Sequence, residues 1–351
     1  MEVKQKLIEE IRTLKPHDRL PSRNALAEKY SAARTTIERA ISELIGEGYL
    51  YARDGSGTYV SEQMPDQKNR SGMVTIGLVI PDIMHDTYPG ILRGVEDVTS
   101  RHDIHLVICN TDNQVDKQSN YIHKLIDSGV HGIIIVPAII GTTDLGLFRK
   151  VREADIPVVF CNRGIDGVEA PRVVSNNYYG AYIAVKHLVA QGCRRIAYIS
   201  RPLYSTSYER YLGYMSALAE AQIPADDKAV IFEPSFATDR QGYDSVLKML
   251  QNGVRPDGIF CFNDGIAKGA YDALTESGFA VGRDVMLIGY DNTSICESLP
   301  VKLSSVKFQT YEIGANAARL MVSMMRGDNV RNDQIIVLQP ELVVRESTGR
   351  A

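Results

Sequence analysis

The segment 51-YARDGSGTYV-60 determines the class of the N-terminal domain. Two short β-prone runs flank Asp54-Gly55-Ser56-Gly57, a turn whose glycines adopt positive φ at little cost. A glycine-rich turn also suggests a phosphate-binding loop, but a Walker loop needs GxxxxGK[ST] before a helix, and a dinucleotide loop also needs a following helix. Here Thr58-Tyr59-Val60 continues as a strand. The segment therefore predicts a tight β-hairpin and excludes both nucleotide loops.

The residues before the hairpin read as three helices. An apolar stripe begins at Val3 and recurs at helical spacing to Leu14, and a break follows from Pro16 to Pro21. Ser22 is placed to cap a second, short helix. The third helix turns one apolar face inward, made of Ile37, Ala40, Ile41, Leu44 and Ile45, and its opposite face carries Arg34, Thr35, Glu38, Arg39 and Ser42.

Three small helices followed by a tight hairpin predict a winged helix-turn-helix over residues 1–62. In such a domain the third helix presents Arg34, Thr35, Thr36 and Arg39 to a DNA major groove. The alternative is a protein-interaction module, in which these residues are a solvated face. Ten Lys/Arg balance ten Asp/Glu in residues 1–62, so a positive DNA-binding surface depends on how the charges are placed.

The sequences "RLPSRNALAEKY", "ARTTIERAISELIGEGYL" and "GSGTYV" closely resemble the DNA-binding domain of the GntR family of bacterial regulators. The family pattern has Arg where this chain has Asn24 and Glu where it has Arg23, so either residue is a candidate phosphate contact. The family's usual Ser cap before the third helix is Ala33 here. The resemblance implies that DNA is contacted by Arg23, Asn24, Arg34, Thr35, Thr36, Arg39 and Gly57.

Residues 63–73 are polar and aperiodic and are predicted to be a linker. Beyond them, β-branched runs apolar on both faces alternate with amphipathic helical windows, the pattern of parallel sheets covered by helices. Two such series predict an α/β fold with two Rossmann-like lobes. We expect one lobe to comprise residues 74–172 with 302–330, and the other 173–301 with 331–351.

Asn, Asp and Arg residues follow many of the predicted strands, where open parallel sheets bind ligands. Planar amide, carboxylate and guanidinium groups pair with adjacent hydroxyls, and aromatic faces cover the C–H side, which is what a neutral sugar requires. Asp and Asn after a strand also cap the next helix, an alternative that stays open for Asp264 and Asn177. The candidate effector-binding residues are Asp82, Tyr88, Asn162, Arg163, Tyr208, Arg210, Asn263 and Asp291.

The sequences "VVFCNRG", "GCRRIAYIS", "PDGIFCFNDGIAKGAYDAL" and "LIGYDNTSICESL" resemble the periplasmic-binding-protein-like effector domain of LacI/GalR repressors. The resemblance implies that Arg163, Arg210, Asn263 and Asp291 bind effector hydroxyls between two lobes. Asn162 stands where the family often has Asp. A GntR-type DNA-binding domain joined to a LacI-type effector domain is the layout of the arabinose-repressor-like (AraR-type) subgroup. This implies a monosaccharide effector, operator DNA as partner, and a homodimer whose two heads read a near-palindromic site.

Composition and motif content narrow the classes of protein to which the chain can belong. The five cysteines are widely spaced and predicted to be reduced, and the absence of CxxC or HxxxH spacing predicts no metal site. The charged N-terminus is no secretory signal and no apolar run reaches ~18 residues, so we expect a cytoplasmic protein without a membrane partner. An enzyme is disfavoured because no catalytic motif or cofactor fingerprint is present. A sugar transport protein and a nucleoside, deoxyhexose or sugar-phosphate effector remain alternatives.

Overall fold

The computed structural model describes residues 2–53, 56–62, 73–236 and 240–349, without the side chains of residues 2, 5 and 12. The chain divides into two compact units, Met1–Val74 and Thr75–Ala351, called here the head and the body. Most of the predicted linker 63–73 and the Asp54-Gly55 half of the hairpin turn lie outside the described residues. The α/β class and the winged N-terminal domain are confirmed.

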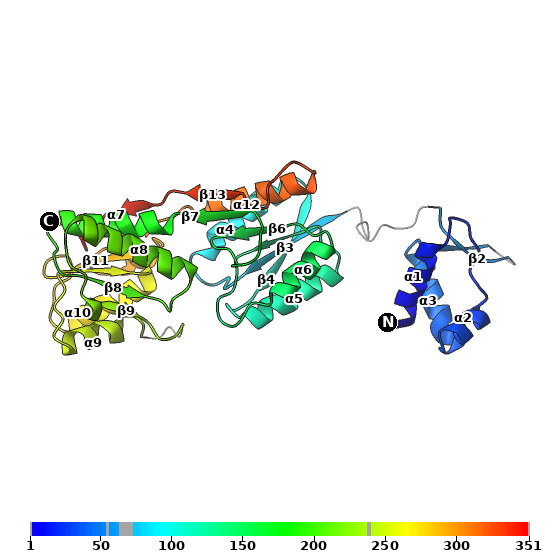
Figure 1. Ribbon diagram of the computed structural model, residues 1–351, viewed down its shortest axis with the longest axis horizontal. Helices are drawn as coiled ribbons and strands as arrows, with labels where there is room; N and C mark the ends of the chain where they lie inside the picture. Colours follow the sequence, from blue (N-terminus) through cyan, green and yellow to red (C-terminus); the bar gives the residue numbers. More distant parts are fainter. Residues whose placement is uncertain (1, 54–55, 63–72, 237–239, 350–351) are drawn as a thin grey trace. The chain divides into compact units, whose positions relative to one another are not determined.

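The head is a small helical domain closed by a hairpin (Figure 1). Its elements are α1 (Glu2–Thr13), α2 (Arg23–Lys29), α3 (Arg34–Gly46), β1 (Leu50–Arg53) and β2 (Gly57–Val60). The Ser22 hydroxyl accepts a hydrogen bond from the Ala25 N–H and caps α2, as predicted. At Ala33 no side chain caps α3. The apolar stripes of the helices meet in one core that includes Leu7, Ile11, Leu26, Ile37, Ile41, Leu44 and Val60.

The hairpin gains a third strand-like segment from the chain before α2. β1 and β2 pair antiparallel from Leu50–Val60 to Arg53–Gly57. Arg19 forms a bridge with Tyr59, and the Leu20 N–H donates to the Thr58 carbonyl at 2.9 Å. Gly57 has φ +129°, a conformation that disfavours other residues. We call β1, β2 and the Arg19–Leu20 segment the wing.

The body begins with a lobe built on a six-stranded sheet of order β13-β7-β6-β5-β3-β4. The pairs within β13-β7-β6-β5-β3 are parallel. In Figure 1, α4 and α12 lie on one side of this sheet and α5 and α6 on the other. The elements of this first lobe are β3 (Val74–Ile80), α4 (Tyr88–Ser100), β4 (Ile104–Asn110), α5 (Val115–Asp127), β5 (Gly132–Ile135), α6 (Leu145–Glu153), β6 (Val158–Cys161), β7 (Arg172–Ser175), α12 (Thr310–Met325) and β13 (Ile335–Leu338).

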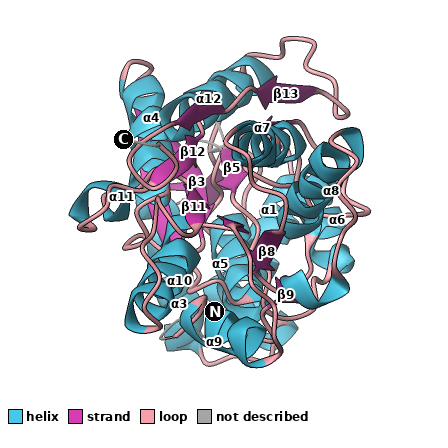
Figure 2. Ribbon diagram, turned by 90° about the vertical axis from the view of Figure 1, so that its left-hand side faces the viewer, coloured by secondary structure: helices cyan, strands magenta, loops and turns pink. Residues whose placement is uncertain are grey.

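The second lobe repeats the design with the order β14-β12-β11-β10-β8-β9, parallel except for β14. Helices α7 and α8 lie side by side on one face, and α9 and α10 cover the other (Figures 1 and 2). Its elements are α7 (Asn177–Ala190), β8 (Ile196–Ser200), α8 (Ser205–Glu220), a short 3-10 turn (Asp227–Ala229), β9 (Val230–Phe232), α9 (Tyr243–Gln251), β10 (Gly258–Cys261), α10 (Asp264–Glu276), β11 (Met286–Tyr290), α11 (Ile295–Ser298), β12 (Ser304–Lys307) and β14 (Glu341–Val343).

The predicted lobe boundaries need correction at three strands. β12, expected in the first lobe within 302–330, pairs with β11 and β14 of the second sheet. β7 and β13, expected mainly in the second lobe within 173–301 and 331–351, pair with each other in the first sheet. A short apolar run has no feature that names its partner strand, because pairing is decided by contacts distant in sequence. The chain consequently crosses between lobes after Ser175, Lys307 and Leu338.

Glycines allow α4 and α12 to pack at very short range in the first lobe. A Cβ at Gly314 would stand 2.0 Å from the Ile91 carbonyl oxygen, and one at Gly94 would stand 2.1 Å from that of Tyr311. Real Cβ atoms do not approach so closely, so only glycine fits at these points. The close contact fixes the position of α4, whose first residue is the candidate effector contact Tyr88.

Candidate DNA interface and effector site

Helix α3 presents a polar face to solvent. Arg34, Thr35, Thr36 and Arg39 are all exposed, whereas Ile37, Ala40, Ile41 and Leu44 are buried on the opposite side. The division follows from the helical repeat, since one stripe fills the core and the other is left outside. The structure thus brings the four predicted third-helix contacts to one accessible face.

Each arginine on this face is held by a glutamate one turn later. Arg34 Nε donates to Glu38 Oε1 and Arg39 Nε donates to Glu43 Oε1, both at 3.1 Å. Lys4 of α1 binds the second oxygen of Glu43 at 3.0 Å. These contacts pre-orient the guanidinium groups while leaving their outer N–H groups turned to solvent. Exposed pairs of this kind add little stability.

The remaining predicted DNA contacts are also accessible. Arg23 and Asn24 lie exposed in the first turn of α2, and Gly57 begins β2. Arg23 and Asn24 share the same short helix and are both exposed, so their positions do not choose between them as the phosphate contact. A Cβ at Gly57 would stand 2.9 Å from Arg19 Nε, the end of a flexible side chain that can move aside, so the positive φ is the reason for glycine.

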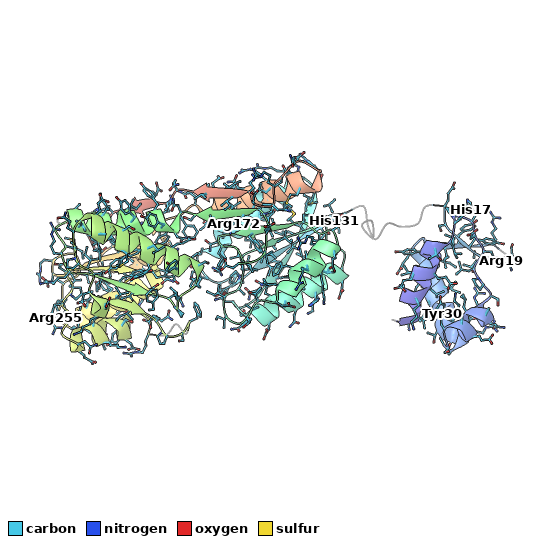
Figure 3. The ribbon with its side chains drawn as sticks, in the orientation of Figure 1. His17, Arg19, Tyr30, His131, Arg172 and Arg255 are labelled. Atoms are coloured by element: carbon cyan, nitrogen blue, oxygen red, sulfur yellow. The ribbon has the colours of Figure 1, made fainter. Side chains whose placement is uncertain are left out.

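The wing carries cationic residues that the sequence pattern did not single out. The Arg53 guanidinium lies over the rings of Tyr51 and Tyr59, at 5.5 and 5.3 Å from their centroids. Arg19 is exposed beside Gly57, and Figure 3 labels it on the wing, across the head from Tyr30. The placement of Arg19 depends on its bridge to Tyr59, a contact between residues 40 positions apart that no local motif encodes.

In the body, Arg163 follows β6 and is almost fully buried. Its Nε donates to the Pro137 carbonyl at 2.6 Å, and its guanidinium carbon lies 5.9 Å from the centroid of Tyr204, which belongs to the second lobe. The Tyr88 hydroxyl is close enough for Arg163 to lower its pKa, although burial dominates and raises it. Arg163 therefore stands where the two lobes meet.

Asn162 and Asp82 lie in the loops that follow β6 and β3, at the same edge of the first sheet. Asn162 has φ +64°, a left-handed conformation that Asn tolerates better than most residues. This backbone shape is a local reason for Asn at the position. The Asp82 carboxylate accepts a hydrogen bond from the Met84 N–H at 2.9 Å and shapes the loop that leads to Tyr88.

Arg210 is the most heavily engaged of the predicted effector residues. Its Nε donates to Asn177 Oδ1 at 3.0 Å, its Nη1 donates to the Phe262 carbonyl, and its Nη2 lies 3.6 Å from Asp291 Oδ1. The rings of Tyr290 and Phe262 flank the guanidinium. The side chains of Arg210 and Asp291 are only 6% and 9% exposed. Four elements of the second lobe thus converge on one buried ion pair.

Burial raises the pKa of Asp291 to about 6, and the attraction of Arg210 and Arg201 only partly offsets that rise. Asp264 nearby behaves similarly, because burial and the charge of Asp291 raise its pKa to about 6. The two carboxylates differ in bonding: Asp264 accepts from the Thr293 N–H, the Thr293 hydroxyl and the Ser305 hydroxyl. Asp264 is a structural anchor, whereas Asp291 keeps acceptor capacity for a ligand.

The structure shows which of the Asn and Asp residues after the strands cap the next helix. The N-cap of α7 is Asn176, whose Oδ1 accepts from the Tyr179 N–H, so Asn177 is left to hold Arg210. Asn263, predicted to bind effector, caps α10 by accepting from the Ile266 N–H at 2.9 Å. Its amide nitrogen donates to no group among the described residues. Asp264 does not cap its own helix.

Tyr208 does not join the cluster. It is 49% exposed on the outer face of α8, and no contact among the described residues links it to Arg210 or Asp291. Helix α8 begins at Ser205, and its first two turns place Ser207 and Arg210 inside and Tyr208 outside.

Tyr204 and Arg201, rather than the predicted Tyr208, lie beside the cluster. The Tyr204 ring packs against Phe236, Phe262 and the Arg163 guanidinium. Arg201 donates to the Phe236 carbonyl at 3.2 Å, and burial lowers its pKa despite the nearby charge of Asp291. Both follow β8, so the rule of polar strand ends was sufficient to find them.

Other features limit the chemistry of the described residues. No described cluster of three or more His, Cys, Asp or Glu side chains is arranged to hold a metal ion. The five cysteines are free and buried in the described structure. None of the described helices has the length and apolarity needed to cross a membrane.

Two family models match the chain. Residues 1–60 match the bacterial regulatory proteins of the gntR family, and residues 185–348 match the periplasmic binding protein-like domain. The chain is 27% identical over 342 residues to the arabinose metabolism transcriptional repressor of Geobacillus stearothermophilus, covering 95% of this chain and 93% of that protein. It is 31% identical over 276 residues to the HTH-type transcriptional repressor PurR of Vibrio atlanticus, covering 78% and 80%.

A solved structure agrees with these relatives. The LacI family transcriptional regulator from Enterococcus faecium with bound ribose superposes with a TM-score of 0.67 at 26% identity, over 78% of this chain and 98% of that one. The two family models and the relatives identify the same class of protein. The chain belongs to the bacterial transcriptional regulators that join a gntR-family DNA-binding domain to a periplasmic-binding-protein-like effector domain, a family of regulators and not of enzymes.

Proposed function

We propose that the chain is a transcriptional repressor of carbohydrate-utilisation genes that a sugar releases from its operator. L-arabinose or a similar monosaccharide is the first candidate effector. The observation that carries the proposal is the buried Arg210–Asp291 pair at the strand ends of the second lobe, with Arg163 of the first lobe nearby.

The chemistry of this cluster suits a polyhydroxylated ligand. Asp291 accepts and Arg210 donates, so two adjacent hydroxyls can bind them as donor and acceptor at once. Asn162 and the amide nitrogen of Asn263 supply further polar groups, and Tyr88 and Tyr204 supply aromatic faces for the C–H side of a ring. The ionised form of Asp291 is costly without a ligand, as its raised pKa indicates, and a hydroxyl donor would stabilise that form.

On the DNA side, α3 enters the major groove with Arg34, Thr35, Thr36 and Arg39, and α2 and the wing contact the backbone. A homodimer would present two heads to half-sites about one helical turn (~34 Å) apart or a multiple of it. The sugar contacts both lobes and favours the arrangement in which they close on it. It shifts DNA binding only by its differential affinity for the two states.

Support for arabinose comes from the full-length relative in Geobacillus stearothermophilus, and support for a pentose comes from the ribose-bound structure. A specific observation favours a second candidate, a sugar phosphate. Among the described residues no carboxylate lies within ion-pair distance of Arg163 or Arg201, so two buried or half-buried cations face the cluster without close counter-charges.

The test is a thermal-shift screen of the purified chain with pentoses, hexoses, deoxyhexoses, nucleosides and sugar phosphates, followed by gel shifts on promoter DNA. Ligand at ~100-fold above its Kd stabilises the protein by about 2.7 kcal/mol. We expect the stabilising sugar to release DNA from the wild type but not from Asp291→Ala, which still binds DNA. Asp244→Ala, an exposed carboxylate of the same lobe, is the matched control. The proposal fails if no carbohydrate changes DNA binding, or if Asp291→Ala responds normally.

A further inference from the structure

Glu38 lies on the flank of the exposed face of α3, partly exposed between two exposed residues. Arg34 lies one turn before it and Ser42 one turn after it, and its side chain is 43% exposed. The buried residues Ile37 and Ala40 keep this face turned outward. Glu38 is the fifth residue of α3, and in a helix-turn-helix the N-terminal residues of the recognition helix contact base edges, so Glu38 can reach a base beside Arg34 if α3 lies in a major groove.

The Glu38 carboxylate has an unused acceptor. Its Oε1 accepts from Arg34 Nε at 3.1 Å, and no group among the described residues donates to its Oε2. Glu43, the other acidic residue of this helix face, has both oxygens occupied, Oε1 by Arg39 and Oε2 by Lys4. Glu43 therefore joins α1 to α3, whereas Glu38 is available to a donor from outside the domain.

An acidic side chain on a DNA-binding helix is repelled by phosphates unless it meets a hydrogen-bond donor. The major-groove edge of cytosine offers the N4 amine, which a carboxylate accepts from. Adenine offers its N6 amine beside the N7 acceptor, which suits the amide of Asn or Gln but repels a second carboxylate oxygen. Thymine and guanine present oxygen or nitrogen acceptors. Cytosine is the base that fits an acceptor-only group.

We propose that Glu38 accepts a hydrogen bond from the N4 amine of a cytosine in each half-site, while its bond to Arg34 Nε turns the outer N–H groups of that arginine toward a neighbouring guanine or phosphate. Glu38 and Arg34 then act as one recognition unit. The inference rests on the proposed placement of α3 in the major groove, and it is independent of the effector.

The experiment is selection of binding sites from a randomised DNA library by the full-length chain, with the wild type, Glu38→Gln, Glu38→Ala and the control Glu9→Gln. Glu9 is exposed on α1, so its replacement changes net charge without touching this face. The wild type and Glu9→Gln are expected to select the same C·G pair in each half-site. Glu38→Gln and Glu38→Ala are expected to lose that preference.

Replacing the selected cytosine by thymine removes the N4 donor. The replacement is expected to weaken the wild type about 5- to 150-fold and the Glu38 variants less than about 3-fold. The inference is overturned if both Glu38 variants keep the full cytosine preference, or if they bind every sequence more tightly by one common factor. Thermal melting of each variant checks folding. Failure of the wild type to select any sequence would instead overturn the proposed DNA binding itself.

Discussion

Replacing Asp291 by Asn should stabilise the protein while it abolishes the effector response. Burial raises the pKa of Asp291 from its ordinary 3.8 to about 6, so the ionised carboxylate is costly in the ligand-free body. Asn keeps the shape of the protonated acid and carries no charge. Arg210 retains its bonds to Asn177 and to the Phe262 carbonyl in this variant.

Two effects of opposite sign set the change in unfolding free energy that we expect for Asp291→Asn. Removing one partner of a buried ion pair typically costs about 3–5 kcal/mol, because the other charge is left uncompensated. Here the pKa near 6 already includes the attraction of Arg210, and one pKa unit corresponds to about 1.36 kcal/mol. The ionised side chain therefore destabilises the folded state by about 3 kcal/mol at pH 7.5, relative to the unfolded chain. We expect Asp291→Asn to recover a gain of this order.

The sign of the pH dependence gives a second readout. Between pH 3.8 and 6 the folded state binds the Asp291 proton that the unfolded state has released, so stability contributed by this group is present below pH 3.8 and lost as pH rises through 6. Urea unfolding followed by circular dichroism at pH 4.5, 6.0 and 7.5 measures both quantities. In Asp291→Asn the fall in unfolding free energy with rising pH is expected to shrink to the part that Asp264 contributes.

The matched control is Asp264→Asn, since Asp264 has a similar pKa but accepts three hydrogen bonds from Thr293 and Ser305. Loss of the Asp264 charge relieves a similar cost of burial, but the amide turns a donor toward donors at a cost of about 1–3 kcal/mol, so Asp264→Asn should gain less stability than Asp291→Asn. The reasoning is refuted if Asp291→Asn is less stable than the wild type at pH 7.5, or if Asp264→Asn gains as much stability as Asp291→Asn.

Further predictions concern the head and the helix packing. Arg34→Ala should weaken operator binding by about 1–3 kcal/mol in gel shifts and leave effector affinity unchanged; unaltered gel shifts would remove Arg34 from the interface. Ala33→Ser should supply the missing cap of α3 and raise the head's stability by about 1 kcal/mol in thermal melts, a gain that would be absent if α3 started elsewhere. Gly314→Ala should cost about 1–3 kcal/mol or more, because its Cβ would stand 2.0 Å from the Ile91 carbonyl oxygen; unchanged urea unfolding would contradict this packing.

Much of the architecture was predictable because it depends on local patterns. Ser22 caps α2, as its position before the helix predicts. The apolar stripe of α3 and its exposed arginines follow from the helical repeat alone. Polar residues after the strands predicted the sheet edges at which Arg163 and Asp291 lie, since strand direction in a parallel sheet places those ends together.

The detailed assignment of roles was not predictable, because several residues compete for each partner. Asn263 and Asn177 look alike in sequence, yet one caps a helix and the other orients Arg210. Tyr208 and Tyr204 are four residues apart, and the true start of α8 at Ser205 decides which of them faces the cluster. These outcomes depend on helix phase to within one residue.

The sequence by itself determined the winged head, the alternation of strands and helices, and the chemistry available at the strand ends, since each rests on residues close together in the chain. Only the tertiary structure decided that β12 joins the second sheet and β13 the first, and that Arg210 and Asp291 share one buried site. Those facts arise from contacts between residues far apart in sequence, where burial and pairing energies exceed the local preferences of any short segment.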